Sequence, residues 1–328
     1  MALIYIEDKA LNVNGRNLLD LGLPRENRNI DLRQRNIVQE RSYDIVEAFT
    51  TIMDNLENNS GGIFYLDAPG GTGKTFVIKL ILAKVRQSWK IAIAVASSGI
   101  AATLLPGGRT AHSVFRLPLD LAQRSQASCT ISKNSGKAKL LRETTLIVWD
   151  ECTMAHAKAL ETVDITLKDV RDSNRLMGGI LVLLAGDFRQ TIPVIRRSTP
   201  ADELRASLKS SSLWPLVKTL KLKLNMRAQL ASEEDTSRFA VQLLQLGERK
   251  NLPMIDGLIT FPPGFCQIVR NVSDLKARVF ENLQDNFANH EWLCERAILA
   301  PKNDMVDSVN FEILQSFPGL AYTYKSFD

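Results

Sequence analysis

Short apolar runs alternate with longer amphipathic stretches along most of the chain. Four runs are apolar throughout, at 63–66, 91–96, 146–149 and 180–185. Such runs are typical of strands that are buried on both faces. Helical spacing of apolar residues predicts one helix within 36–57 and a second at about 155–172. Alternating strands and helices predict an α/β fold, in which helices cover both faces of a parallel sheet.

The pattern changes after the Trp-Pro pair at 214–215. Residues 220–224 alternate leucine with lysine and predict the first strand of a new region, followed by helices and a short strand at 297–300. The first 31 residues are polar and rich in turn-forming residues, apart from one short apolar segment. We therefore predict three parts: a leader at 1–31, an α/β domain at 32–215 and an incomplete second domain at 216–328.

Composition narrows the class of protein. The 328 residues are 23% charged and 45% hydrophobic, as in an ordinary globular protein, and the net charge of +5 is compatible with a nucleic-acid partner. The four cysteines are far apart and form no CxxC pair, so we predict neither a metal cluster nor a disulfide framework. No apolar run is long enough to span a bilayer, and the N-terminus lacks the basic segment of a secretory signal. We predict an intracellular protein with no membrane partner.

A glycine-rich segment follows the first apolar run. Residues 68–75 read Ala-Pro-Gly-Gly-Thr-Gly-Lys-Thr, and a breaker-free helical stretch comes next. A strand, a glycine-rich turn and a helix in this order are typical of the phosphate cradle of P-loop NTPases. Ala68 departs from the pattern, which usually begins with glycine. The segment predicts nucleoside-triphosphate binding by Pro69, Gly70, Gly71, Thr72, Gly73, Lys74 and Thr75, with Lys74 on the β- and γ-phosphates and Thr75 on Mg²⁺.

Further polar residues follow later strands. Asp150 and Glu151 end the third apolar run, where we predict that Asp150 holds Mg²⁺ and Glu151 polarises the attacking water. Gln190 follows the Gly-Asp pair that ends the fourth run, and we predict that it senses the γ-phosphate. Arg227 could cross the cleft as an arginine finger. Taken alone, such a glutamine could equally be a solvated side chain, and such an arginine is usually a surface charge.

Together these segments resemble the petite-integration-frequency family of superfamily-1 DNA helicases, which is related to RecD. They look most similar to the helicase part of Helitron-type transposon proteins. The similar segments are 68–75, 96–102, 108–113, 149–154, 186–194 and 224–227. The resemblance implies a RecA-like first domain, an incomplete second RecA-like domain, ATP and Mg²⁺ as cofactors, and an ATP-dependent 5′-to-3′ DNA helicase activity. It also implies single-stranded and duplex DNA as partners, a nuclear location, and roles of the DNA repair, recombination, telomere or transposition type.

The resemblance assigns roles to further residues. Gln39 matches the glutamine that reads adenine, although its neighbours depart from the family's order. Thr110, His112, Ser113 and Phe115 match the strand-binding motif, in which hydroxyl and imidazole groups bond phosphates and Phe115 stacks on a base. Phe115 could instead belong to the core.

Two observations leave alternatives open. Lys133, Lys137 and Lys139 lie in a serine-rich stretch that we interpret as a solvated loop. The two further family motifs expected after Arg227 are missing, which predicts a C-terminally truncated chain. The alternatives are a nucleotide-dependent DNA-binding module without unwinding activity and an inactive relic of a transposon.

Overall fold

The chain divides into two compact units, Met1–Leu252 and Pro253–Asp328. The computed structural model describes residues 43–118, 120–121, 128–191, 193–195, 199–226, 234–248, 254–255, 258–259, 261 and 264–319. The leader predicted at 1–31 lies outside the described residues.

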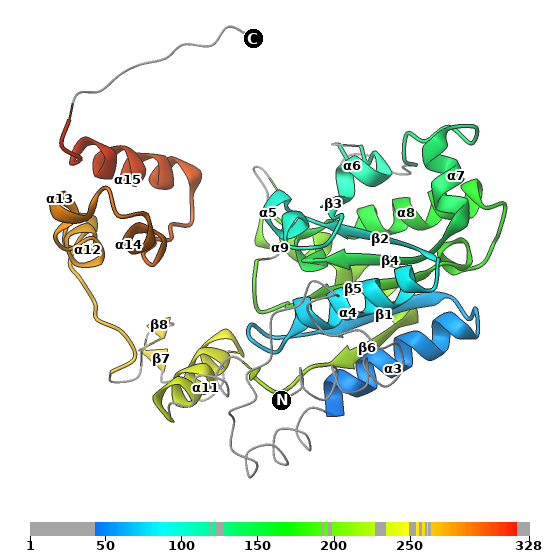
Figure 1. Cartoon of the computed structure of the whole chain (residues 1–328), viewed down its shortest axis with the longest axis horizontal. Coiled ribbons are helices and arrows are strands. Elements are labelled where there is room, and N and C mark those ends of the chain that lie inside the picture. Colours follow the sequence, from blue (N-terminus) through cyan, green and yellow to red (C-terminus); the bar gives the residue numbers. More distant parts are fainter. Residues whose placement is uncertain are drawn as a thin grey trace, which may run out of the picture. The chain divides into compact units, whose positions relative to one another are not determined.

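The first unit contains a six-stranded parallel sheet with the order β3-β2-β4-β5-β1-β6 (Figure 1). Its strands are β1 (Gly62–Asp67), β2 (Ile91–Ala96), β3 (Arg109–Thr110), β4 (Thr144–Asp150), β5 (Leu181–Gly186) and β6 (Val217–Lys221). The four apolar runs of the sequence form β1, β2, β4 and β5. The predicted α/β fold with a parallel sheet is confirmed.

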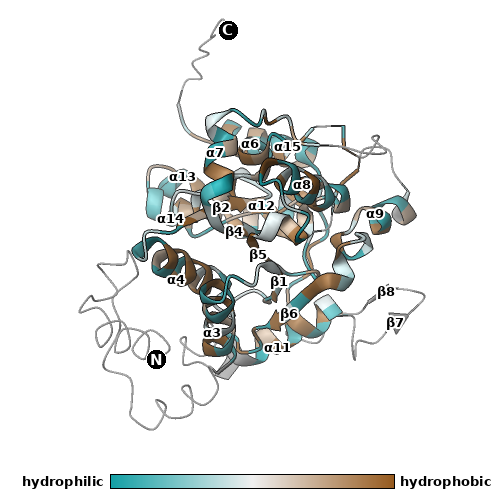
Figure 2. Ribbon diagram, turned by 90° about the vertical axis from the view of Figure 1, so that its right-hand side faces the viewer, coloured by the Kyte–Doolittle hydropathy of each residue, from teal (hydrophilic) through white to brown (hydrophobic). Residues whose placement is uncertain are grey.

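Helices cover both faces of this sheet, and alternate residues of each strand pack to opposite sides. Phe64 and Leu66 pack with α3 (Tyr43–Glu57) and α4 (Lys74–Gln87), whereas Ile63 and Tyr65 pack with α8 (Ala157–Val170). In Figure 2 the strands lie between α4 and α8. The other helices of this unit are α5 (Gly99–Thr103), α6 (Ala111–Phe115), α7 (Gly136–Glu143), η2 (Cys152–Met154), η3 (Leu176–Gly179), α9 (Pro200–Ala206), η4 (Leu208–Ser210), η5 (Trp214–Leu216) and α11 (Glu234–Glu248).

The last strand of the sheet corrects the predicted domain boundary. Residues 220–224 were expected to begin a second domain, but β6 pairs in parallel with β1, with Leu220 opposite Leu66. The boundary at 215 is therefore wrong, because this strand completes the first sheet. Its alternation has a simple cause: β6 is an edge strand with exposed positions, whereas the central strands are buried.

The second unit is described by short elements. β7 (Met254–Ile255) and β8 (Leu258–Ile259) pair antiparallel, and α12 (Val272–Val279), α13 (Leu283–Asn286), α14 (His290–Cys294) and α15 (Asn303–Gln315) follow. Residues 297–300, where we predicted a strand, have no regular structure. The described residues of this unit contain no parallel sheet, so the incomplete second RecA-like domain stays a prediction. Across the described ranges of both units, no helix is long and apolar enough to cross a bilayer.

The burial of the four cysteines predicts two classes of thiol. Cys129 and Cys152 are buried, and burial raises the pKa of Cys129 to about 11 and that of Cys152 further. Cys266 and Cys294 are exposed. Because the thiolate is the reactive species, we expect a disulfide reagent at pH 8 to modify two thiols rapidly in the folded protein, and all four after unfolding.

Single substitutions assign these two classes. Cys266→Ser should reduce the rapid count from two to one, whereas Cys129→Ser should leave it at two. Rapid modification of three or more thiols in the folded protein would contradict the burial of Cys129 and Cys152.

Candidate nucleotide site and nucleic-acid interface

The glycine-rich turn connects the end of β1 to the start of α4. Gly71 and Gly73 both have φ of 86°, in the left-handed region that favours glycine. A Cβ atom at Gly71 would also overlap the side chain of Asn225. Thr72 closes the turn by donating from its hydroxyl to the carbonyl oxygen of Pro69 at 2.7 Å. This conformation places the amino end of α4, with its free N–H groups and positive dipole end, at the turn.

The lysine of the turn meets both predicted catalytic acids. Lys74 Nζ lies 2.8 Å from Asp150 Oδ1 and also pairs with Glu151. Burial alone would lower the pKa of Lys74, but Asp150 and then Glu151 outweigh it, so the pKa lies above its ordinary value. Lys74 therefore carries its positive charge throughout the physiological pH range.

The end of β4 holds the two acids in place. The Trp149 indole N–H donates to Ser97 Oγ at 3.0 Å, and the Ser97 backbone N–H donates to the carbonyl oxygen of Asp150 at 3.1 Å. Glu151 has φ of 48° and ψ of 38°, a left-handed conformation that is uncommon for residues other than glycine. Its backbone N–H donates to Asp150 Oδ1 at 2.9 Å. Backbone strain of this kind is typical of functional sites, where the surroundings hold it.

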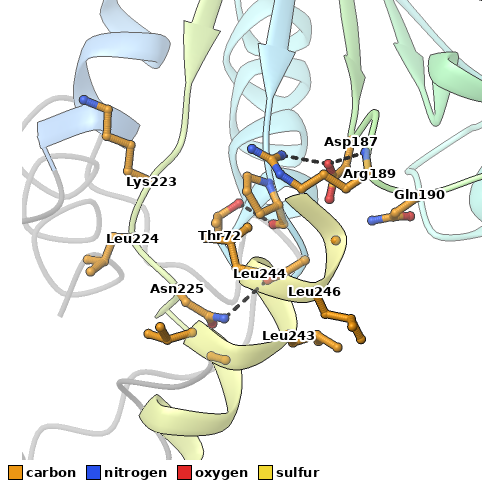
Figure 3. A pocket seen from close by; sticks show the side chains of 15 residues that line it. Thr72, Asp187, Arg189, Gln190, Lys223, Leu224, Asn225, Leu243, Leu244 and Leu246 are labelled. Carbon is orange, nitrogen blue, oxygen red and sulfur yellow. Dashed lines mark hydrogen bonds and ion pairs between the residues drawn. The ribbon is translucent and has the colours of Figure 1, made fainter. Parts of the chain in front are cut away.

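A third turn follows β5 and carries Gln190. The backbone N–H of Arg189 donates to Asp187 Oδ1, and that of Gln190 donates to the Asp187 carbonyl oxygen, both at 3.0 Å. Gln190 is exposed and lines a pocket of about 660 Å³ together with Pro69 and Thr72 of the glycine-rich turn (Figure 3). Residues of α11 also line this pocket.

The remaining predicted nucleotide residues have different outcomes. Thr75 is half-buried in the first turn of α4, next to Lys74. Gln39 and Arg227 lie outside the described residues, so their roles stay predictions. The side chain of Asn225 packs against the glycine-rich turn, and its Nδ2 donates to the carbonyl oxygen of Gly70 at 3.4 Å.

The predicted DNA-binding residues surround the short helix α6. Thr110 caps its amino end by accepting a hydrogen bond from the Ser113 N–H at 3.3 Å. His112 and Ser113 are exposed, as a DNA contact requires. Phe115 is only 1% exposed, and its ring centroid lies 5.9 Å from that of Trp149. This burial contradicts a base-stacking role for Phe115, because the side chain belongs to the core that covers the sheet.

A cluster of cationic residues beside α6 was missed by sequence reasoning. Lys137 was interpreted as part of a solvated loop, but it lies in α7 and donates from Nζ to the carbonyl oxygens of Ser113 and Val114, at 2.6 and 3.5 Å. Partial burial and the charges of Arg116 and Arg109 lower the pKa of Lys137. We call Arg109, Arg116 and Lys137 the basic cluster. The flanking arginines were visible in the sequence, but nothing there indicated that Lys137 joins them.

The other two lysines of that stretch differ from Lys137. Lys133 is exposed and pairs with Asp169 and Asp172, both at 3.0 Å. Lys139 is exposed on α7. Both side chains are exposed, as the interpretation as a solvated loop predicted, but Lys139 lies in a helix and not in a loop.

A buried hydroxyl behind the acids gives a test of the site's packing. Thr153 Oγ1 is buried and, among the described residues, has no hydrogen-bond partner. Thr166 Oγ1 is also buried, but it accepts from the Cys129 N–H at 2.9 Å and donates to the Thr162 carbonyl oxygen at 2.7 Å. We expect Thr153→Val to leave the free energy of unfolding unchanged or to raise it by up to about 1 kcal/mol, and Thr166→Val to lower it by about 1–3 kcal/mol. Urea denaturation measures both, and equal losses would contradict the assignment.

A family model described as PIF1-like helicase matches residues 42–252 of the chain. The chain is 26% identical over 277 residues to the ATP-dependent DNA helicase PIF1 of Candida albicans, an alignment that covers 82% of this chain and 28% of that protein. It is 33% identical over 144 residues to the ATP-dependent DNA helicase Pif1 of a Psychrobacter species, covering 44% of this chain and 21% of that protein. The chain thus spans less than a third of the length of either relative.

Two solved structures share the fold. The Pif1 helicase from Candida albicans superposes with a TM-score of 0.54 at 23% identity, over 84% of this chain and 55% of that chain. The Pif1 helicase from Bacteroides, in complex with ADP-AlF3 and single-stranded DNA, superposes with a TM-score of 0.56 at 21% identity, over 82% of this chain and 57% of that chain.

Proposed function

Since this chain belongs to the PIF1-like helicase family, we propose that it is an ATP-driven DNA motor, which moves 5′ to 3′ along single-stranded DNA and separates duplex DNA. One observation carries the chemical half of this proposal: Lys74 of the glycine-rich turn contacts both Asp150 and Glu151 at the end of β4. A phosphate-binding lysine and two acids in direct contact form the core of a phosphoryl-transfer site.

Each of these residues has a distinct role in hydrolysis. Lys74 stabilises the negative charge that develops on the transferred phosphate. In the structure the Lys74 ammonium group also forms an ion pair with the Glu151 carboxylate. Binding of the triphosphate draws the ammonium group away from that carboxylate. Glu151 is then free to orient the attacking water and to accept its proton. Gln190 and Arg227 contact the γ-phosphate and respond to its presence, and Gln39 contacts the adenine.

The residues beside Lys74 fit a magnesium ion bound with the nucleotide. Sites of this kind use one or two carboxylates and substrate phosphates rather than a cage of protein ligands. Asp150 and the Thr75 hydroxyl would hold the ion, and Asp150 is already within the contact network of Lys74. Mg²⁺ supplies charge neutralisation on the phosphates.

The proposed DNA contact lies at α6. His112 and Ser113 are exposed, and the basic cluster of Arg109, Arg116 and Lys137 flanks them. Cationic side chains and hydroxyl groups are the usual partners of phosphate oxygens. The Bacteroides Pif1 helicase, which shares this fold, was solved in complex with single-stranded DNA. That complex supports single-stranded DNA as a partner of this chain. We also propose a Helitron-type ancestry and a nuclear location for this protein.

A combined assay tests the function as a whole. DNA-stimulated ATP hydrolysis is measured beside strand displacement on the same chain. Hydrolysis with displacement supports the motor. Hydrolysis or ATP binding without displacement indicates the alternative of a nucleotide-dependent DNA-binding module, and the absence of ATP binding would refute the proposal.

Removal of the Glu151 carboxylate separates binding from hydrolysis. We expect Glu151→Gln to lower kcat by about 10²-fold or more, because a general base contributes this much, while ATP binding is kept. Fluorescent-nucleotide titration and phosphate release measure the two quantities. Glu143→Gln, at the exposed end of α7 just before β4, is the matched control and should retain wild-type turnover. Equal turnover in Glu151→Gln and the wild type would remove Glu151 from this role.

The basic cluster predicts a salt-dependent DNA contact. Lys137→Ala should weaken binding to single-stranded DNA by about fivefold and reduce the slope of log affinity against log salt concentration by about one. Lys139→Ala on the same helix is the control and should change both quantities less. Fluorescence anisotropy across a salt series measures them. Equal effects of the two substitutions would show that Lys137 has no special position.

A further inference from the structure

The guanidinium group of Arg189 contacts carboxylates from three elements of the first unit. Nη1 lies 2.9 Å from Asp187 Oδ1, just after β5, and 3.4 Å from Asp67 Oδ1, at the end of β1. On its other edge, Nη2 and Nε lie 3.1 and 3.3 Å from Oε1 of Glu248, the last residue of α11. One side chain therefore joins two neighbouring strands of the nucleotide site to a helix that follows the sheet.

We propose that Arg189 is a positioning residue for ATP hydrolysis, which couples the position of Gln190 to that of α11 through its ion pair with Glu248. The inference rests on the proposed function, because the coupling acts through the γ-phosphate sensor Gln190. It adds a path by which the state of the nucleotide reaches an element outside the sheet.

The first part of the coupling is the turn that carries Gln190. The Asp187 side chain is almost fully buried, and a buried carboxylate is stable only when it is paired and hydrogen-bonded. Asp187 receives both the backbone N–H and the guanidinium group of Arg189. Since the Gln190 N–H donates to the Asp187 carbonyl oxygen, a shift of Arg189 moves the backbone that carries Gln190.

The second part is the contact of Arg189 with α11. A Cβ atom at Gly247 would lie 3.5 Å from Arg189 Cβ, so the backbone of α11 packs against the stem of this side chain. One turn earlier, Leu243 and Leu244 line the same pocket as Thr72 of the glycine-rich turn (Figure 3). A displacement of α11 therefore changes a wall of the pocket that Gln190 also lines.

Only arginine has the geometry for this link. Its planar group presents donors on separate edges, which here face Glu248 on one side and the two aspartates on the other. Lysine carries the same charge as a single point with no fixed fork. Arg189→Lys therefore keeps the charge of the site and removes the link, and Glu248→Gln removes the link from the side of the helix.

The first test measures the link without nucleotide. Hydrogen exchange of α11 amides is compared in the wild type, Arg189→Lys, Glu248→Gln and the control Glu57→Gln. Glu57 is exposed and ends α3, so the control also removes a carboxylate from the last position of a 15-residue helix. We expect exchange in α11 to accelerate roughly fivefold in the first two variants, the effect of one partly exposed ion pair, and to stay unchanged in the control. Unchanged exchange in Glu248→Gln would overturn the proposal.

The second test measures hydrolysis. Glu248→Gln should lower kcat by about tenfold, because a displaced sensor costs rate, while the affinity for MgADP, which has no γ-phosphate, changes less than about twofold. An equal loss of kcat and MgADP affinity would indicate general structural damage and overturn the positioning role. A wild-type protein without ATPase activity would refute the proposed function itself, whereas an active wild type with an equally active Glu248→Gln would refute only the role of Arg189.

Discussion

The carbonyl oxygen of Gly186 connects the candidate nucleotide site to the sheet. It accepts hydrogen bonds from the backbone N–H of Ala68, the first residue of the glycine-rich turn, and from the Tyr65 hydroxyl, at 3.2 and 3.1 Å. On the other side, a Cβ atom at Gly186 would lie 2.9 Å from Thr153 Cγ2. Because β5 lies between β1 and β4, this residue sets the spacing between the turn and the two acids. The crowding explains why a glycine ends β5.

Electrostatics then determine the charge state of the candidate nucleotide site. One ammonium group faces two carboxylates, so Lys74 is held charged and Glu151 is held by Lys74. The pKa of Lys74 is raised above the ordinary value of 10.5. A raised pKa stabilises the fold fully below pH 10.5, and this contribution is lost as the pH rises through the higher value of the folded state. The raised pKa of Lys74 therefore adds no pH dependence to the free energy of unfolding between about pH 6 and pH 9.

Sequence reasoning succeeded where burial on both faces or backbone geometry left a local mark. The central strands were found because they are apolar throughout, and the turn was found because Gly71 and Gly73 need positive φ. It failed where one pattern has two causes. The alternating leucines and lysines of β6 mark an edge strand of the first sheet, although the same pattern is typical of a strand in a new domain. The local sequence around an aromatic residue such as Phe115 is the same whether its side chain packs into the core or stacks on a base.

The sequence by itself determined the four central strands of the sheet, the glycine-rich turn after β1 and the acid pair that ends β4. Each of these depends on residues close together in the chain, or on the general rule that ligands bind at the carboxyl ends of parallel strands. Only the tertiary structure decided which distant residues complete the site. Lys137 reaches Ser113 across 24 positions, and Arg189 reaches Glu248 across 59. Such contacts depend on the path of the chain between them, and a charged residue carries no local sign of the partner that the fold will bring to it.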